Sequence, residues 1–288
     1  GWHEGARFHD PMIYQNGKLR SNTAGEYGPE VYVDFLSDFM QRSKLAGEPF
    51  FAYYSMALAH DVTDDLLTQV PYVPGKDRWM NYGEMIQSLD EMVGRVVRKL
   101  DELQLRENTI ILFTGDNGTA VRSKLRHRGN AKYEYEKVYS IRNGKRVRGG
   151  KGTLLDIGTN VPLIANWRGK IEPGAQSDAL VDFSDWLPTL VEVAGGHKEQ
   201  ERDGRSFAST LFTVDSPPAR KYAFAEGRGK RAWVRTQKYK LYNDGKYFDL
   251  TIDPFEKEPL TRTNGDAAAK KKFLENALMR LDLPRNKK

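Results

Sequence analysis

Hydrophobic positions recur along the chain with two different periods, and each period predicts a different kind of element. Apolar residues fall every three or four positions over 29–45 and over roughly 78–104, which predicts two helices that each bury one face. A third helix is predicted over 184–196, where the pattern ends in glycine. Three apolar runs are short enough to be strands: 49–60, 109–114 and 161–167.

The order of these elements favours a layered α/β domain. The run 109–114 has no polar alternation, as expected for a strand that is covered on both faces. Strands and helices that alternate along the chain predict an α/β/α core built on a largely parallel, mixed sheet. We therefore predict a partial α/β core over residues 1–205.

The pattern changes after about residue 205. Short runs that alternate apolar and polar residues follow, and Asp244-Gly245 between two of them signals a hairpin, because a tight two-residue turn needs positive φ. Residues 266–283 have the pattern of a helix. Residues 206–288 are thus predicted to form a small α+β subdomain, an antiparallel sheet with a terminal helix.

Composition excludes several kinds of chemistry. The 288 residues include no cysteine, which excludes disulfides, thiolate metal sites and a cysteine nucleophile from this chain. The mean hydropathy is −0.66, and the apolar runs have only strand length, so no membrane span is predicted. The chain opens with "GWHEGARFHD", without an initiating Met or a signal-peptide pattern, and we expect it to begin inside a longer protein.

Positive charge is concentrated in one stretch. The formal net charge is +6, and residues 121–151 carry eleven Lys and Arg against two Glu, a local charge of +9. Such a stretch can focus a positive potential on an anionic partner. For a charge run alone, a solvated loop without a role is the favoured interpretation. No nucleic-acid-binding motif is present, so a nucleic acid is not the expected partner.

The strand 109–114 ends in residues suited to a metal. Asp116 and Asn117 follow it, and Gly115 and Gly118 on either side let the backbone turn sharply. In an open sheet, ligands bind beyond the carboxyl ends of strands. Carboxylate and amide oxygens suit calcium or magnesium better than zinc. Asp-Asn-Gly is also common in simple turns, and both interpretations stay open at this point.

Two further residues are candidates for work on an anion. Lys151 stands among Gly149, Gly150 and Gly152, which would let an anion approach the backbone while the ammonium supplies charge. The spacing of a Walker-type loop is absent, and a flexible basic loop is the alternative. His60 follows the apolar run 49–59 and would also lie at a strand's carboxyl end, although a lone histidine is more often structural.

Taken in order, several segments closely resemble the sulfatase family of the alkaline phosphatase superfamily. They are "EPFFAYYSMALAHDV", "MIQSLDEMVGRVVRKLDELQLRENTIILFTGDNG", "GGKGTLLDIGTNVPLIANWRGKIEPGA", "LVDFSDWLPTLVEVAG" and, more loosely, "KYFDLTIDPFEKEPL". The resemblance implies an alkaline-phosphatase-like fold and hydrolysis of aryl or glycan sulfate esters.

The resemblance also assigns roles to the candidate residues. Asp116 and Asn117 match two ligands of a single active-site Ca²⁺, and Lys151 matches the lysine that contacts the sulfate group. His60 matches the histidine that approaches the sulfate and the leaving-group oxygen. The two-zinc phosphatases of the superfamily resemble a pattern with Asp-His, whereas Asn117 offers an oxygen ligand and favours calcium.

Some parts of the family pattern are missing. The nucleophile, a formylglycine made within C/S-x-P-x-R, has no counterpart: the one serine match, "SPPAR" at Ser216–Arg220, lies after the core and reads better as a linker. A second acidic pair for the metal and a Gly-Lys-x-His segment are also absent. The chain therefore resembles the C-terminal portion of a sulfatase, and we expect it to be inactive in isolation.

The basic stretch is the candidate for substrate recognition. It is long for a connection between the segment of Asp116 and the segment of Lys151. Its candidate contacts to a sulfated small molecule or polysaccharide are Arg122, Lys124, Arg126, Arg128 and Arg148. Several residues that the family often has near the site are replaced here, by Ala57, "LLDIG" and "TN". The resemblance therefore does not predict which residues line the substrate pocket. Two alternatives remain: a phosphodiesterase or phosphonate hydrolase of the same superfamily, and a non-catalytic polyanion-binding protein. The resemblance implies a periplasmic or extracellular protein, and the sequence predicts no oligomeric state.

Overall fold

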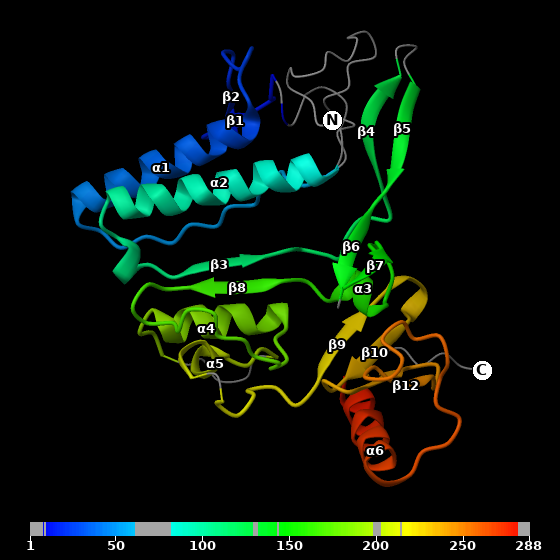
Figure 1. Cartoon of the computed structure of the whole chain (residues 1–288). Helices are drawn as coiled ribbons and strands as arrows, with labels where there is room; N and C mark the ends of the chain where they lie inside the picture. The colour runs from blue at the N-terminus through cyan, green and yellow to red at the C-terminus, as the bar shows by residue number, and fades with distance from the viewer. Residues whose placement is uncertain are drawn as a thin grey trace. The chain divides into compact units, whose positions relative to one another are not determined.

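The chain divides into two units, which are described separately. The structure, a computed structural model, describes residues 8, 10–60, 82–128, 132–142, 144–197, 203–213 and 215–281, with the side chains of 123–134 and 136 left out. Unit 1 comprises Gly1–Thr109 and Ala120–Gly149, and unit 2 comprises Ile110–Thr119 and Gly150–Lys288. Figure 1 shows the course of the chain through both units.

Two long helices dominate unit 1. The helices α1 (Gly28–Ala46) and α2 (Tyr82–Glu102) form where the sequence predicts helices, although residues 78–81 of the second prediction lie outside the described residues. The two helices lie side by side (Figure 1). Arg95 Nη2 on α2 donates to Asp34 Oδ1 on α1 at 2.6 Å. Five apolar residues form the buried cluster of this unit: Phe8, Val33, Leu58, Met85 and Met92.

The run 49–60, predicted as a strand, forms none in its described structure. Leu58 is buried against the two helices, whereas Phe51 and Tyr53 are 70% and 85% exposed. The prediction is wrong because an apolar, aromatic run can serve to pack on helices without joining a ladder of backbone hydrogen bonds. Three short elements complete the N-terminal part: β1 (Tyr14–Gln15), β2 (Lys18–Leu19) and η1 (Arg106–Asn108).

The basic stretch folds into two consecutive antiparallel hairpins. Their strands are β4 (Arg122–Arg128), β5 (Lys132–Lys137), β6 (Tyr139–Arg142) and β7 (Lys145–Arg148). The Val138 N–H donates to Val121 O at 3.4 Å, and the Gly149 N–H donates to Val138 O at 3.1 Å, so Val138 joins the two hairpins. The described residues of β4 to β7 therefore form strands rather than an open loop.

Unit 2 contains the strand that carries the candidate metal ligands. The strand β3 (Ile111–Thr114) pairs with β8 (Leu163–Asn166), and the pair is antiparallel. The largely parallel sheet is not confirmed, because every strand pair among the described residues is antiparallel. A parallel pair needs a crossover that returns the chain in the same direction. Between β3 and β8 lie instead the two hairpins and a short helix, α3 (Asp156–Thr159).

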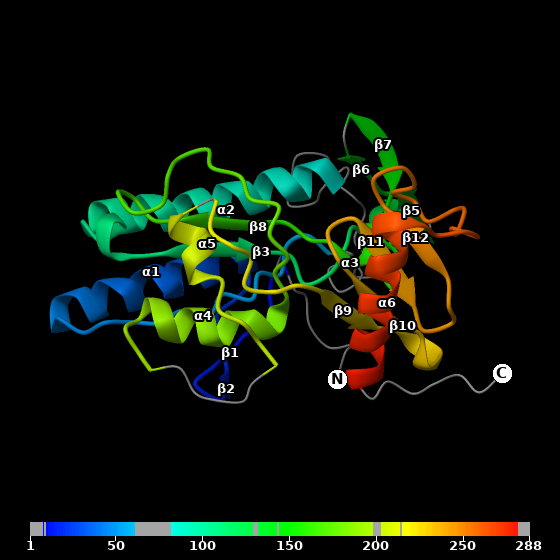
Figure 2. The ribbon, with the colours of Figure 1, turned by 90° about the horizontal axis from the view of Figure 1, so that it is seen from below.

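The C-terminal part of unit 2 is a small sheet with a helix, as the sequence predicts. Its antiparallel order is β12-β11-β10-β9, and Figure 2 shows α6 (Gly265–Arg280) running along this sheet. The strands are β9 (Ala223–Glu226), β10 (Ala232–Arg235), β11 (Tyr239–Tyr242) and β12 (Tyr247–Asp249). Gly245 has φ 89° in the hairpin between β11 and β12, at the predicted turn. The predicted boundary near residue 205 stays a prediction.

Four short helices complete unit 2: η2 (Phe183–Asp185), α4 (Trp186–Val193), α5 (Ala208–Phe212) and η3 (Arg228–Lys230). The first two together account for the helix predicted over 184–196. Across the described parts of both units, no helix is long and apolar enough to cross a membrane.

Candidate active site

The turn that follows β3 brings two oxygen-bearing side chains together. This Asp-Asn turn (residues 115–118) exposes Asp116 and leaves Asn117 half-buried. Asn117 Nδ2 donates a 2.7 Å hydrogen bond to Asp116 Oδ1. No other described residue is hydrogen-bonded to Asp116 Oδ2 or Asn117 Oδ1, so both oxygens can accept a further ligand. The pair thus presents two hard oxygen donors of the kind that calcium prefers.

The loop that carries Lys151 is fastened directly to the Asp-Asn turn. We call residues 149–158 the lysine loop. The backbone N–H groups of Gly150 and Lys151 both donate to Thr119 O at 3.0 Å, and the Gly118 N–H donates to Gly158 O at 3.0 Å. The Lys151 side chain is exposed. Two segments about thirty residues apart in the sequence therefore meet in one place, and the ammonium of Lys151 is free to face solvent or an anion.

Glycines make this close approach possible. A Cβ atom at Gly118 would lie 2.1 Å from the carbonyl oxygen of Ile157, and one at Gly150 would lie 2.5 Å from Ile157 Cγ1. At Gly158 a Cβ would lie 2.5 Å from Gly150 O. Because the Ile157 carbonyl cannot move aside as a flexible side chain can, a larger residue at Gly118 would separate the turn from the loop. A larger residue at Gly150 or Gly158 would instead disturb the packing within the loop.

Gly118→Ala is therefore expected to weaken this contact, whereas Gly115→Ala is its matched control. A Cβ at Gly115 would find its nearest neighbour at 3.6 Å, an ordinary contact. We expect Gly118→Ala to cost about 1–3 kcal/mol by overpacking. Hydrogen exchange of residues 150–158 measures the effect: the exchange should rise in Gly118→Ala and stay unchanged in Gly115→Ala. Equal exchange in both variants would mean that the turn does not hold the loop.

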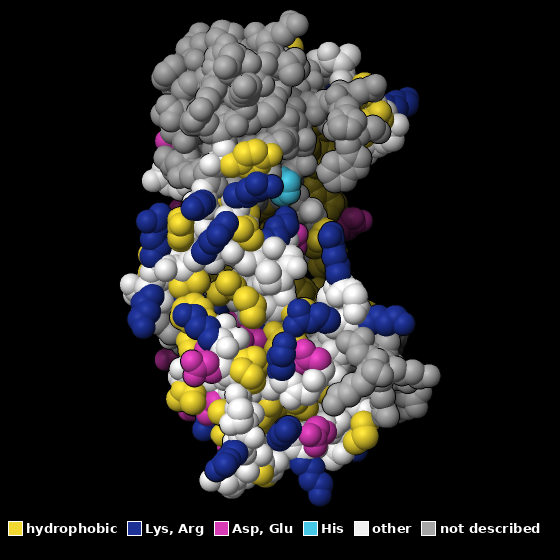
Figure 3. All heavy atoms as spheres, turned by 90° about the vertical axis from the view of Figure 1, so that its right-hand side faces the viewer, with side chains coloured by type: hydrophobic (Ala, Val, Ile, Leu, Met, Phe, Trp, Pro, Cys, Tyr) yellow, Lys and Arg dark blue, Asp and Glu magenta, His cyan; other side chains and the backbone are white. Residues whose placement is uncertain are grey.

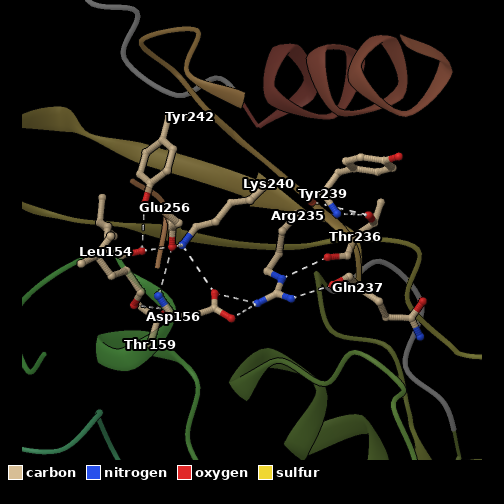
Figure 4. Close-up of polar contacts among 11 residues, drawn as sticks. Leu154, Asp156, Thr159, Arg235, Thr236, Gln237, Tyr239, Lys240, Tyr242 and Glu256 are labelled. Atoms are coloured by element: carbon tan, nitrogen blue, oxygen red, sulfur yellow. Dashed lines mark hydrogen bonds and ion pairs between the residues drawn. The ribbon is translucent and has the colours of Figure 1, made fainter. Parts of the chain in front are cut away.

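A buried ion network lies behind the lysine loop (Figure 4). Its four charged members are Asp156, Arg235, Lys240 and Glu256, two of each sign. The Lys240 side chain is 0% exposed, and its Nζ donates to Glu256 Oε1 and to the Leu154 carbonyl, both at 2.7 Å. Arg235 Nη1 donates to both carboxylate oxygens of Asp156 at 2.7 Å. The network is thus bonded to the lysine loop at Leu154 and Asp156.

The surroundings of Lys240 act on its pKa in opposite directions. Burial lowers the pKa of Lys240, and the nearby carboxylates of Glu256 and Asp156 oppose that shift. Tyr242, whose hydroxyl donates to Glu256 Oε2 at 2.5 Å, has its pKa raised first by burial and then by this bond. The Asp156 N–H also donates to Glu256 Oε1 at 3.2 Å. Each buried charge therefore has an opposite charge and hydrogen bonds around it.

Comparison with known proteins identifies the family of the chain. A family model described as "Sulfatase" matches residues 4–196. The chain belongs to the sulfatase family. Human arylsulfatase G is 31% identical over 222 residues, which cover 74% of this chain and 40% of that protein. An N-acetylgalactosamine-6-O-sulfatase of Bacteroides thetaiotaomicron is 27% identical over 242 residues, which cover 75% of this chain and 44% of that protein.

A solved structure shares the fold of the sulfatase chain. It shows a protein in complex with its substrate D-glucosamine-2-N,6-O-disulfate, and it matches with a TM-score of 0.67 at 18% identity. The match covers 100% of this chain and 76% of the other. This chain spans less than half the length of the two curated sulfatases above.

The structure describes the side chains of some of the other predicted site residues of this sulfatase chain but not of all. His60 is exposed in unit 1, directly before the undescribed residues 61–81, and its approach to a sulfate stays a prediction. Arg122 and Arg148 are exposed on β4 and β7. Lys124, Arg126 and Arg128 also belong to β4, and their side chains lie outside the described residues.

The "SPPAR" segment has a structural explanation in the sulfatase chain. Arg220 Nε donates to Asp185 Oδ2 at 2.8 Å, and the Asp185 side chain is only 1% exposed. Ser216 Oγ lies 3.4 Å from Thr210 Oγ1. Arg220 is therefore committed to a buried ion pair, which supports its exclusion as part of a nucleophile motif.

The candidate calcium site of the sulfatase chain is partial within the described residues. No group of three or more His, Asp or Glu gathers there in a way that could hold a metal. Asp116 and Asn117 fit calcium by the chemistry of their oxygens, but they supply two donors where the ion takes ~6–8. Further ligands would have to come from water, substrate or other residues.

Sequence reasoning missed the ion network. Lys240 stands in the alternating run "KYKLY", where period-two alternation predicts that the lysine side chain faces solvent. All four residues of β11 are buried instead. The partner Glu256 lies 16 residues further along the chain, in a turn where its φ is 56°. No local pattern links the two residues.

Proposed function

We propose that this chain carries part of the active site of a calcium-dependent sulfatase, which as a complete protein hydrolyses sulfate esters on a glycan. The observation that carries the proposal is the backbone contact between the Asp-Asn turn and the lysine loop. The Gly118 N–H to Gly158 O bond and the two bonds to Thr119 O hold Asp116 and Asn117 beside the segment of Lys151. Oxygen ligands and an ammonium on adjacent segments suit an anionic ester.

The chain's own residues would do three things in this reaction. Asp116 and Asn117 would hold a calcium ion, which when bound draws electron density from a sulfate oxygen. Lys151 would neutralise negative charge that develops on the sulfuryl group. His60, if protonated, would donate its proton to the departing alcohol oxygen. The ester S–O bond breaks, water supplies the oxygen of the new S–O bond, and an alcohol and sulfate are released.

The proposed substrate class is a sulfated sugar. Two matched proteins are named for sulfated glycan substrates: one for the 6-O-sulfate of N-acetylgalactosamine, and one bound to a disulfated glucosamine. The basic stretch of this chain adds a local charge of +9 for an anionic polymer. By the same analogy we propose a periplasmic or extracellular location. The formylglycine nucleophile would come from a part of the complete protein that this sequence does not contain.

The proposal is tested by comparing the complete natural protein with the isolated 288-residue chain on 4-nitrophenyl sulfate. We expect turnover by the complete protein, its loss on chelation and its return with added calcium. The isolated chain should show no turnover, because two oxygen ligands bind calcium weakly and the nucleophile is missing. Turnover by the isolated chain would contradict the proposed division of the site.

A further inference from the structure

One face of the β6–β7 hairpin gathers side chains suited to a sulfated sugar. Tyr139 is paired with Arg148, and Ile141 is paired with Arg146. Residues directly opposite each other in an antiparallel pair point to the same side of the sheet. We call these four residues the arginine face. All four are exposed, Tyr139 by 37% and Ile141 by 72%.

The opposite side of the same hairpin is less exposed. It carries Ser140, Arg142, Lys145 and Val147, and Val147 is 7% exposed. The burial of Val147 fixes which side faces outward, since a two-residue period places the arginine face on the other side. Figure 3 shows that Lys and Arg side chains are spread over one face of the molecule.

The two arginines keep their hydrogen-bond donors available. The Arg146 guanidinium lies 3.9 Å from the ring centroid of Tyr139. Stacking of this kind orients the planar group while leaving its N–H groups in the plane for an oxyanion. Among the described residues, neither Arg146 nor Arg148 takes part in an ion pair or a side-chain hydrogen bond. Exposed arginines without acidic partners are poised for an external anion.

The preceding hairpin repeats the same arrangement. The Arg122 guanidinium lies 4.5 Å from the ring centroid of Tyr135, and Arg122 is paired with Lys137 across the strands. Val138, buried at 3% exposure, connects this hairpin to the next through its backbone hydrogen bonds. An arginine–tyrosine contact therefore occurs on each of the two joined hairpins.

We propose that the arginine face binds a sulfate-bearing sugar unit of a polysaccharide, separate from the ester that is hydrolysed. The two guanidinium groups would donate paired N–H bonds to sulfate oxygens, and Tyr139 with Ile141 would contact the apolar side of the sugar ring. This inference rests on the proposed function only for the link between binding and hydrolysis. Arg148 stands three residues before Lys151 in the sequence, so the lysine loop follows directly on the strand that carries Arg148.

Titration calorimetry of the 288-residue chain with a heparin-derived octasaccharide tests the inference. Arg146→Ala with Arg148→Ala should weaken binding by about tenfold or more, because two charge-assisted contacts are lost. Arg146→Lys should weaken it by about threefold, since the charge stays but the planar fork is lost. Lys145→Ala is the matched control, an exposed charge on the other side of the hairpin, and should change binding less than about twofold.

Three outcomes would overturn the inference. They are equal losses in the double arginine variant and in Lys145→Ala, equal affinity for unsulfated hyaluronan, and equal affinity for duplex DNA of matched charge. The substituted residues are exposed, and circular dichroism checks that the variants fold. The titration involves no turnover, so binding by the arginine face and hydrolysis by the complete protein can fail independently of one another.

Discussion

Glu256→Gln is expected to lower the free energy of local opening around the lysine loop by about 3–5 kcal/mol, because it leaves buried Lys240 without its carboxylate. Lys240 is 0% exposed and lies 2.7 Å from Glu256 Oε1. The second nearby carboxylate, on Asp156, is 3.6 Å from Lys240 and is already paired with Arg235. Native-state hydrogen exchange over 150–158 and 232–242 measures the local opening free energy directly.

Tyr242→Phe is the control for this prediction. It removes one hydroxyl that donates to Glu256 Oε2 and leaves every charge in place. We expect a loss of about 0.5–1.5 kcal/mol, the usual net contribution of one hydrogen bond. Lys240→Met combined with Glu256→Gln should cost less than the sum of the two single changes, because the residues interact directly. Similar losses for Glu256→Gln and Tyr242→Phe would show that the charge pair contributes little.

Lys151→Ala in the complete protein should lower kcat for an aryl sulfate by about 10²–10³-fold, comparable to the removal of one donor from an oxyanion site. The stability should not change, because the Lys151 side chain is exposed and its backbone contacts to Thr119 need no side chain. Lys145→Ala removes the same charge from the β6–β7 hairpin and is the control. A Lys151→Ala enzyme within about threefold of that control would exclude Lys151 from the reaction.

The sequence predicts those parts of the fold whose signal is periodic. The apolar stripes of α1 and α2 repeat every three or four residues, and both helices form where the stripes predict them. Gly245 marks the β11–β12 hairpin because a residue without Cβ tolerates the positive φ found there. In each case local chemistry alone decides the structure.

Pairing partners carry no such local signal. The strand β3 was predicted correctly, but its antiparallel pairing with β8 depends on the path of residues 115–162 and not on either strand. The run 49–60 has the composition of a strand, yet Leu58 packs on helices instead. The period of a sequence predicts which face is buried more reliably than it predicts what covers that face.

The candidate site also combines residues that a local sequence pattern marks with contacts that only the fold creates. Residue type and glycine spacing mark Asp116, Asn117 and Lys151 as candidates, and their proposed roles come from the resemblance to the sulfatase family. The contact that joins them could not be predicted, because it consists of backbone bonds from Gly118 and Thr119 to the lysine loop. Lys240 and Glu256 are likewise ordinary surface residues in the sequence and become a buried pair only in the folded protein.

The central claim, that the Asp-Asn turn and the lysine loop are built for a sulfate ester, is tested most directly by substrate preference. The measurement is kcat/KM of the complete protein for 4-nitrophenyl sulfate and 4-nitrophenyl phosphate under the same conditions with calcium. Asn117 offers an oxygen donor where a two-zinc phosphatase would use an imidazole, so we expect sulfate to be preferred by at least about 100-fold. A preference for the phosphate ester would contradict the account.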